Sequence, residues 1–251
     1  CLFLNLILNL KFILLIIYMK ILSFDVGIKN LSFCILNDSV IEDWGILNIC
    51  IDDVCDHKNA RTGQRCDKSV KFVCKSGGFS PTGTFQVCPA HKKLKQYSDK
   101  KFKCQPKKKN PMLDQGKCIV ETLSKKDNFL EVDLVVIENQ PALKNPTMKS
   151  IQMILYSYFL IQGVTNANSS IESIQMINAR NKLKAYTGPP IKCDIKDKYK
   201  KTKFLGIQYC SHMIKESNQD QQWLSLFEQS KKKDDLADAY LQGMYVLKSK
   251  V

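Results

Sequence analysis

Residues 20–49 read KILSFDVGIKNLSFCILNDSVIEDWGILNI, and this stretch sets the architecture of the chain. It contains three apolar, partly alternating runs, at 20–27, 31–36 and 40–49, and such runs are typical of β-strands. Short polar connections, Gly-Ile-Lys-Asn and Asn-Asp-Ser, separate the runs. Two tight connections between three strands predict an antiparallel meander.

A fourth strand is indicated at 134–137, where LVVI is a continuous apolar run that ends in Glu138. An unbroken run of this kind is typical of a strand covered on both faces. A fifth strand is predicted within 170–179. A meander followed by alternating helices and strands predicts an α/β domain with a mixed sheet. The predicted helices are 112–126, 147–163, 198–215 and 231–248.

The composition fits a globular domain with an uneven distribution of charge. Of the 251 residues, 44% are hydrophobic and 25% are charged, which is enough apolar content for an ordinary core. The net charge is +14, and residues 55–110 hold 15 basic side chains against three acidic ones, a net charge of +12. This excess suits a polyanion such as nucleic acid better than an acidic protein surface.

The eleven cysteines point to metal binding. Their number is odd, and six of them fall in one window together with two histidines. Metal ligation in a reducing intracellular compartment explains this clustering better than a secreted disulfide framework. The candidate ligands are Cys55, Cys66, Cys88 and His91, spaced C-x10-C-x21-C-x2-H, with Cys74 and His57 as alternates.

These residues lie in a basic segment at 52–110 whose apolar content is too low for it to fold unaided. We therefore predict a small insertion held together by a structural zinc ion in a Cys3His site. The alternative is that some of the cysteines are small apolar residues in a loop and that the lysines at 100–109 form a solvated face.

Residues 1–18, CLFLNLILNLKFILLIIY, resemble a signal peptide or a membrane anchor at first sight. However, the segment opens with Cys, Lys11 and asparagines interrupt it, and no small-residue cleavage site precedes Met19. We interpret it as upstream sequence that is not native to the protein. We expect the functional domain to be 19–251, interrupted by the insertion, with no membrane segment.

Four acidic residues lie where a buried core disfavours charge. Asp25 interrupts the first strand, Glu138 ends the most apolar strand, and Asp235 and Asp238 share one face of the last helix. Taken singly, turn chemistry or the helix dipole would explain each aspartate. Four carboxylates drawn together instead favour a pair of divalent cations, an arrangement that hydrolyses phosphodiesters. Asp234 ranks below them because it lies about 100° from its neighbour around the helix.

The blocks that carry these acids resemble a known family. FDVGIKNLSFCIL (24–36), VVIENQPALKNPTMKSIQ (135–152) and KKDDLADAYL (232–241) are similar, in this order, to the catalytic blocks of the RuvC-like Holliday junction resolvases of poxviruses and other large DNA viruses. The resemblance spans most of the chain from Met19 to about Val246. It implies an RNase H-like fold, a mixed five-stranded sheet flanked by helices, which the Cys/His-rich basic insertion would interrupt.

The resemblance also implies a function. Members of this family are homodimeric endonucleases that use magnesium, with manganese as a substitute, to resolve four-way DNA junctions by paired nicks during recombination and replication. Their Asp, Glu, Asp, Asp set, which holds two metal ions, falls on Asp25, Glu138, Asp235 and Asp238. A protein of viral origin would act at the site of viral replication in the host cell.

Lysines near the acids are candidates for contact with DNA. Lys144 and Lys149 follow Glu138, and Lys29 follows the first block. The apolar helix 147–162 is the candidate dimer interface, and no small-molecule cofactor is expected. Two alternatives stay open: another RNase H-like nuclease that acts on flaps or RNA/DNA hybrids, and a non-catalytic zinc-containing nucleic-acid-binding protein whose acids are incidental.

Overall fold

The structure is a computed structural model, and it describes residues 19–49, 54–66, 68–75, 84–105, 111–217 and 219–250. The predicted upstream segment at 1–18 lies outside these residues. The chain divides into two compact units. We call Cys1–Ile49 with Gly116–Val251 the sheet unit, and Cys50–Gln115 the insertion unit.

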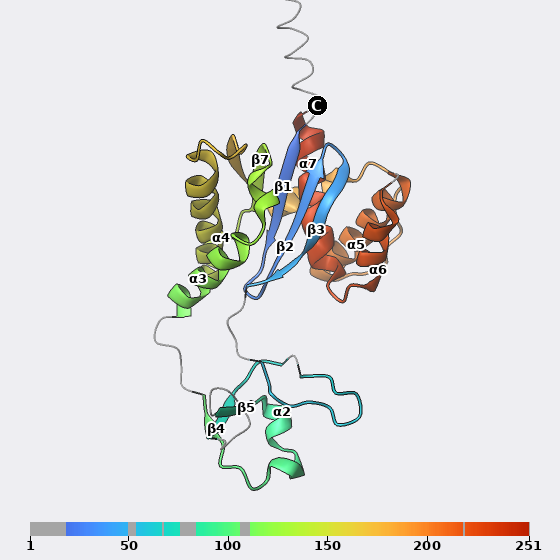
Figure 1. Cartoon of the computed structure of the whole chain (residues 1–251). Helices are drawn as coiled ribbons and strands as arrows, with labels where there is room; N and C mark the ends of the chain where they lie inside the picture. The colour runs from blue at the N-terminus through green and yellow to red at the C-terminus, as the bar shows by residue number, and fades with distance from the viewer. Residues whose placement is uncertain are drawn as a thin grey trace, which may run out of the picture. The chain divides into compact units, whose positions relative to one another are not determined.

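The sheet unit contains a five-stranded mixed sheet (Figure 1). Its strands are β1 (Lys20–Val26), β2 (Asn30–Asn37), β3 (Val40–Asn48), β7 (Leu134–Glu138) and β8 (Ser173–Ile177). They lie in the order β3-β2-β1-β7-β8. The first three form the predicted antiparallel meander, whereas β7 pairs in parallel with both β1 and β8. This order and these directions are those of the RNase H-like fold, so the predicted fold class is confirmed.

Local chemistry fixes the two turns of the meander. A Cβ atom at Gly27 would lie 2.5 Å from the carbonyl oxygen of Asn30, so no side chain fits at the end of β1. Between β2 and β3, Asp38 adopts a φ of 52°, a left-handed conformation that aspartate tolerates better than most residues. The polar connections seen in the sequence therefore form the turns that bring β1, β2 and β3 into register.

Helices cover both faces of the sheet (Figure 1). They are α3 (Pro111–Leu123), α4 (Pro146–Phe159), α5 (Lys198–Glu216), α6 (Gln221–Gln229) and α7 (Lys233–Lys250), with short helical turns η2 (Asp127–Leu130), η3 (Leu160–Val164) and η4 (Ala179–Ala185). The sequence analysis did not include α6. Within the described residues, no helix is both long enough and apolar enough to cross a bilayer.

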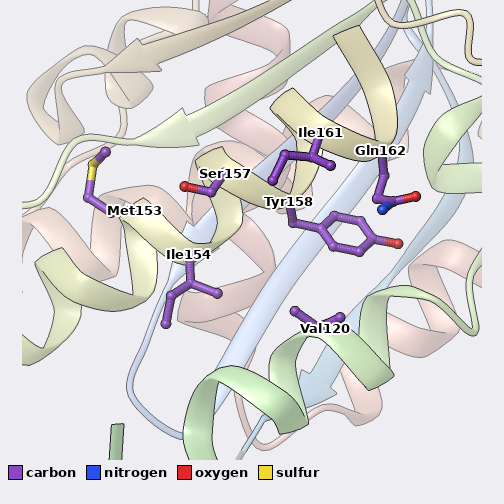
Figure 2. Close-up of a pocket in the computed structure, with 7 residues that line it drawn as sticks. All are labelled: Val120, Met153, Ile154, Ser157, Tyr158, Ile161 and Gln162. Carbon is purple, nitrogen blue, oxygen red and sulfur yellow. The ribbon is translucent and has the colours of Figure 1, made fainter. Parts of the chain in front are cut away.

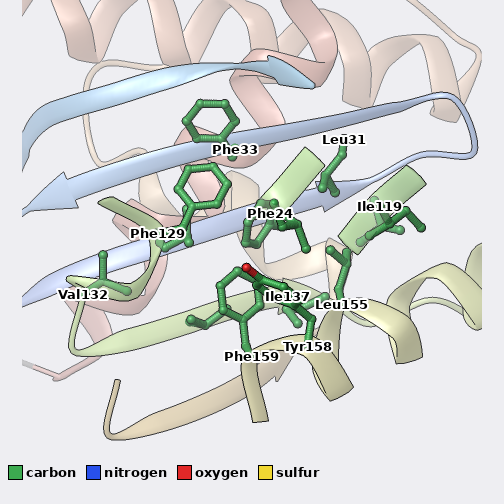
Figure 3. Packing of buried hydrophobic residues seen from close by; sticks show 14 of the residues in the cluster. Phe24, Leu31, Phe33, Ile119, Phe129, Val132, Ile137, Leu155, Tyr158 and Phe159 are labelled. Carbon is green, nitrogen blue, oxygen red and sulfur yellow. The ribbon is translucent and has the colours of Figure 1, made fainter. Parts of the chain in front are cut away.

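The face toward α3 and α4 holds the larger core. Phe24 of β1 and Ile137 of β7 lie there in a cluster with Leu155 and the rings of Phe129 and Phe159 (Figure 3). The ring centroids of Phe129 and Phe159 are 5.6 and 5.4 Å from that of Phe24. Because side chains alternate along a strand, residues next to Phe24 and Ile137 point to the opposite face.

The opposite face is covered by α7, which two buried side chains hold in place. Trp44 of β3 donates its indole Nε1–H to the carbonyl oxygen of Leu236, at 3.1 Å. Gln242 donates its Nε2 to the Ser23 hydroxyl and to the carbonyl oxygen of Phe24, at 3.2 and 3.1 Å. These bonds satisfy buried polar groups and fix the position of α7 along the strands.

The insertion unit has a smaller sheet of its own. Its elements are β4 (Phe72–Lys75), β5 (Thr84–Val87), α2 (Pro89–Lys92), η1 (Lys95–Tyr97) and β6 (Lys103–Cys104), and the strand order is β5-β4-β6. Buried Cys55, Val87 and Cys88, with Phe72 and Phe85 against them, form its core. The sequence analysis predicted the Cys/His-rich insertion but not these short strands.

Gly243 offers a test of how tightly α7 packs on the sheet. A Cβ atom there would lie 2.7 Å from Cδ1 of Leu36 and 3.3 Å from Cβ of Ser23, both fully buried residues. We expect Gly243→Ala to lower the free energy of unfolding by about 1 to 2 kcal/mol, because overpacking outweighs the better helix propensity of alanine. Urea denaturation measures the difference.

The matched control is Gly116→Ala in α3, where the new methyl group meets Ile154 at an ordinary 3.5 Å. This variant should keep the parent's stability or gain up to about 1 kcal/mol from helix propensity. Equal stabilities for the two variants would mean that α7 is packed more loosely than described.

Candidate active site

The ends of two neighbouring strands bring Asp25 and Glu138 together. Parallel pairing of β1 and β7 puts Phe24 opposite Ile137, so the next residue on each strand lies beside the other. The carboxyl groups of Asp25 and Glu138 lie close enough to interact and, after burial, this interaction raises the pKa of Asp25. Alternation turns both toward the face that α7 covers, where Ser23 also lies.

The first turns of α7 supply the two other predicted acids. The charges of Asp235 and Asp238 both act on Asp25, so the four carboxyl groups share one electrostatic environment. We call Asp25, Glu138, Asp235 and Asp238 the acid cluster. Asp234, the lower-ranked candidate, instead forms an ion pair with Lys203 of α5.

A buried lysine that the sequence analysis did not identify lies among these acids. Lys182, in η4 directly after β8, is 8% exposed, and its Nζ is 2.5 Å from Oδ2 of Asp238. Burial by itself would lower the pKa of Lys182, but the charges of Asp238 and two other acids of the cluster outweigh it and raise the pKa. Lys182 therefore stays charged and compensates part of the negative charge.

This compensation is incomplete. Burial, followed by the hydrogen bond and the charge of Glu138, raises the pKa of Asp25 well above its usual value. Burial also raises the pKa of Asp238 to about 7, although Lys182 acts to lower it. Besides Lys182, only the half-exposed Lys232, whose Nζ lies 3.6 Å from Oδ2 of Asp235, forms an ion pair with these four acids among the described residues. Protons therefore stay in the cluster near neutral pH, and a divalent cation would take their place.

The donor atoms of the acid cluster fit magnesium, which binds carboxylate oxygens. Asp25, Glu138, Asp235 and Asp238 would hold it. The cluster is spread more widely than the cysteine and histidine site described below. Among the described residues, only that second site has three or more candidate ligand atoms that all lie within 4.8 Å of one another.

A glutamine braces the loop that follows Glu138. Gln152 of α4 is fully buried, and its Oε1 accepts from the backbone N–H of Gln140 at 2.8 Å. Lys149 donates its Nζ to the same Oε1 and to Oδ1 of Asn139, both at 3.1 Å. The side chain of Lys149 thus holds this loop beside the acid cluster.

The other two lysines predicted to contact DNA have exposed side chains. Lys144 lies in the loop between β7 and α4, and Lys29 lies in the turn between β1 and β2. Contact of Lys29, Lys144 and Lys149 with DNA stays a prediction.

The insertion unit brings Cys55, Cys66, Cys88 and His91 into one compact site. Nδ1 of His91 lies 3.4 Å from Sγ of Cys55 and 3.5 Å from Sγ of Cys88. Tetrahedral zinc with ordinary Zn–S and Zn–N bonds separates its sulfur and nitrogen ligands by about 3.6 Å, so the donors fit this metal. We call these four residues the Cys/His site, and they can hold a metal ion.

Backbone groups favour a thiolate at this site. Burial acts to raise the pKa of Cys88, but the backbone N–H groups of His91 and Ala90 hydrogen-bond to its sulfur and lower the pKa overall. The alternates Cys74 and His57 are outside the compact set. The ring of His57 lies tilted against that of His91, with ring centroids 3.8 Å apart, and Nδ1 of His57 pairs with the Tyr97 hydroxyl at 2.9 Å.

A comparison of sequences identifies a relative. No protein-family model matches the chain. The uncharacterized protein L451 of Acanthamoeba polyphaga mimivirus is 31% identical, over 91% of this chain and 74% of the viral protein. The chain belongs to the L451 family. A member of this family is thus encoded by a giant virus.

Solved structures with a similar fold include two resolvases and a RuvC protein. The yeast mitochondrial resolvase Ydc2 is 17% identical, over 93% of this chain and 83% of that chain, with a TM-score of 0.45. The Fowlpox virus resolvase, crystallised with substrate Holliday junction DNA, is 16% identical over 92% and 98%, with a TM-score of 0.43. Thermus thermophilus RuvC is 11% identical over 92% and 95%, with a TM-score of 0.40.

The raised pKa of Asp238, about 7, predicts that metal binding depends on pH. Below pH 7 this carboxyl group is protonated in the folded protein, and a cation must displace the proton. The proton of Asp238 alone should therefore make the affinity for Mn²⁺ rise by about 50-fold from pH 5 to pH 7 and by less than about 2-fold from pH 7 to pH 8. Electron paramagnetic resonance of free Mn²⁺, with the zinc-loaded chain, measures it.

Asp238→Asn should make this profile less steep, because asparagine has no proton to lose in this range; the pH dependence that remains would come from Asp25, whose pKa is also raised. Glu172→Gln, which removes an exposed acid just before β8, should leave the profile unchanged. A parental profile that shows no change between pH 5 and pH 7 would contradict the assignment.

Proposed function

We propose that the chain is a magnesium-dependent, structure-selective endonuclease that resolves four-way DNA junctions by paired nicks. The observation that carries the proposal is the acid cluster, in which Asp25 and Glu138 end adjacent strands and face two aspartates of α7. The three sequence blocks that resemble the RuvC-like resolvases contain these same four residues. The Fowlpox virus resolvase was crystallised with substrate Holliday junction DNA, and we propose the same class of substrate here.

Each residue of the site has a part in this proposal. Magnesium bound to the acid cluster would activate the attacking water and stabilise the leaving oxygen of the phosphodiester. Asp25 and Glu138 hold their position because they end paired strands, and α7 is fixed by Trp44 and Gln242. Lys182 adds a positive charge where the negative phosphate must approach, and Lys29 and Lys144 would contact the DNA backbone nearby.

Removing either strand-borne carboxylate tests the nuclease. Asp25→Asn and Glu138→Gln should each lower the cleavage rate of a labelled four-way junction in magnesium by at least about 100-fold, because a metal-holding carboxylate acts in the chemical step. Junction affinity, measured without magnesium, should stay within about 3-fold of the parent, since neither change removes a positive charge. Glu172→Gln is the control and should cleave at the parental rate.

Parallel assays separate the alternative functions. Faster cleavage of a flap or of an RNA/DNA hybrid than of the junction would identify that nucleic acid as the substrate. The assignment of the acid cluster as the active site would stand. Binding of the junction without cleavage at any magnesium or manganese concentration would support the non-catalytic alternative. A Glu138→Gln variant that cuts at the parental rate would refute the site itself.

We propose further that the Cys/His site holds one structural zinc ion, which reinforces the small core of the insertion unit. Metal analysis should find about one zinc per chain. Cys88→Ser should lose most of this zinc and lower hydrogen-exchange protection across β4 and β5. Cys104→Ser, which changes an exposed cysteine of the same unit, should retain both the zinc and the hydrogen-exchange protection. Full zinc content in the Cys88→Ser protein would exclude this ligand set.

We propose that the chain forms a homodimer through α4, because two opposed cuts in a two-fold junction require two active sites. An apolar pocket of about 420 Å³ lies between α3 and α4 (Figure 2). Val120, Met153 and Ile161 line it and are 43%, 41% and 61% exposed. Exposed apolar surface of this kind is typical of a protein interface.

Sedimentation velocity checks this interface. Ile161→Glu should shift a dimeric parent toward monomer, because it places a charge in an apolar contact. Val40→Glu, at an exposed apolar position on β3, is the control and should leave the sedimentation coefficient unchanged. A parent that is monomeric at all concentrations that support cleavage would rule out the dimer.

A further inference from the structure

The insertion unit carries a lysine-lined groove that the proposed active site does not use. Its volume is about 620 Å³, within the range of ordinary ligand sites. Lysines predominate among its lining residues, and Asp99 is the acid among them. The lysines are Lys75, Lys100, Lys101 and Lys103.

The small sheet places two of these lysines, Lys75 and Lys103, on the face away from the Cys/His site. In the pairing of β4 with its neighbours, Lys103 lies opposite Val73, and Thr84 lies opposite Lys75. These four residues share one face of the sheet, because side chains alternate along a strand. Phe72, on the other face, packs in the core with the Cys/His ligands. Because the core of the unit lies on one face of this sheet, the face that bears Lys75 and Lys103 is open to a partner.

The positive charges of the groove are not neutralised within the described part of the chain. None of the four lysines there forms an ion pair within 4.0 Å, whereas Arg65 of the same unit pairs with Asp56 at 3.2 Å. Lys100 lies over the ring of Phe85, with its Nζ 5.4 Å from the centroid. The side chains of Lys75, Lys101 and Lys103 are exposed.

We propose that this groove binds the sugar-phosphate backbone of nucleic acid without reading base sequence. Lysine ammonium groups act as point charges that displace counterions from phosphates, which gives affinity without specificity. A protein partner is a poorer fit, because protein interfaces are depleted in lysine and enriched in arginine and aromatic residues, and neither lines this groove. The inference goes beyond the proposed nuclease, since such binding requires no chemistry at the acid cluster.

Two triple variants with equal loss of charge test the groove in the full zinc-loaded chain. The groove variant is Lys75→Gln, Lys101→Gln, Lys103→Gln. The control is Lys58→Gln, Lys93→Gln, Lys95→Gln, which removes three exposed lysines of the same unit that do not line the groove. Affinity for two fluorescent 20-base-pair DNA duplexes of unrelated sequence is measured by anisotropy without magnesium, at several salt concentrations.

The groove variant should bind both duplexes about 10-fold more weakly at 0.1 M salt, and the slope of log affinity against log salt should fall by about 2 to 3. The control should lose less than about 3-fold. Equal losses in the two variants would overturn the proposal, because net charge alone would then explain them. So would unchanged binding by the groove variant, or competition by polyglutamate at the same charge concentration as DNA.

The outcome is separate from that of the nuclease test. If the chain never cleaves a junction but the triple variants differ as expected, the groove proposal is supported and the proposed active site is refuted. If the chain cleaves junctions but the two triple variants bind duplex equally well, the proposed active site is supported and the groove proposal is refuted.

Discussion

Concentrated negative charge at the ends of β1 and β7 is the constraint on which the sheet unit depends. Asp25 and Glu138 are brought together by parallel pairing, and burial makes the ionisation of Asp25 costly. Lys182, placed by the turn after β8, compensates part of this charge. Two aspartates of α7, a helix held on the sheet by Trp44 and Gln242, add to the negative charge. A cluster that still retains protons near neutral pH is one prepared for a divalent cation.

Strand-borne features of this site could be predicted from the sequence, because each interrupts or ends an apolar run. Asp25 and Glu138 stand out in this way, and parallel neighbours bring such positions to one sheet edge. Lys182 has no comparable signal. It lies in a polar segment that also contains Lys184, and only the tertiary packing of η4 against α7 selects one of them as the buried partner of Asp238.

The elements that were missed are short and depend on distant partners. α6 is nine residues long, and Phe227 within it is stabilised by stacking on Trp44 of β3, with ring centroids 5.5 Å apart. The strands β4 to β6 have two to four residues each and little apolar content, so their pairing depends on the core around the Cys/His site. Such segments carry too little periodicity to be recognised without their three-dimensional context.

The hydrogen bonds of Gln242 fix the number of residues between Gln242 and Asp238 within α7. Asp238 and Gln242 are one helical turn apart, and one bonds Lys182 while the other bonds β1. A single residue added between them would rotate the aspartates by about 100° and move them by about 1.5 Å. Insertions and deletions in natural variants of this family should therefore fall in the connections before α7. The spacing between Asp238 and Gln242 should stay constant, so this helical turn can anchor sequence alignments.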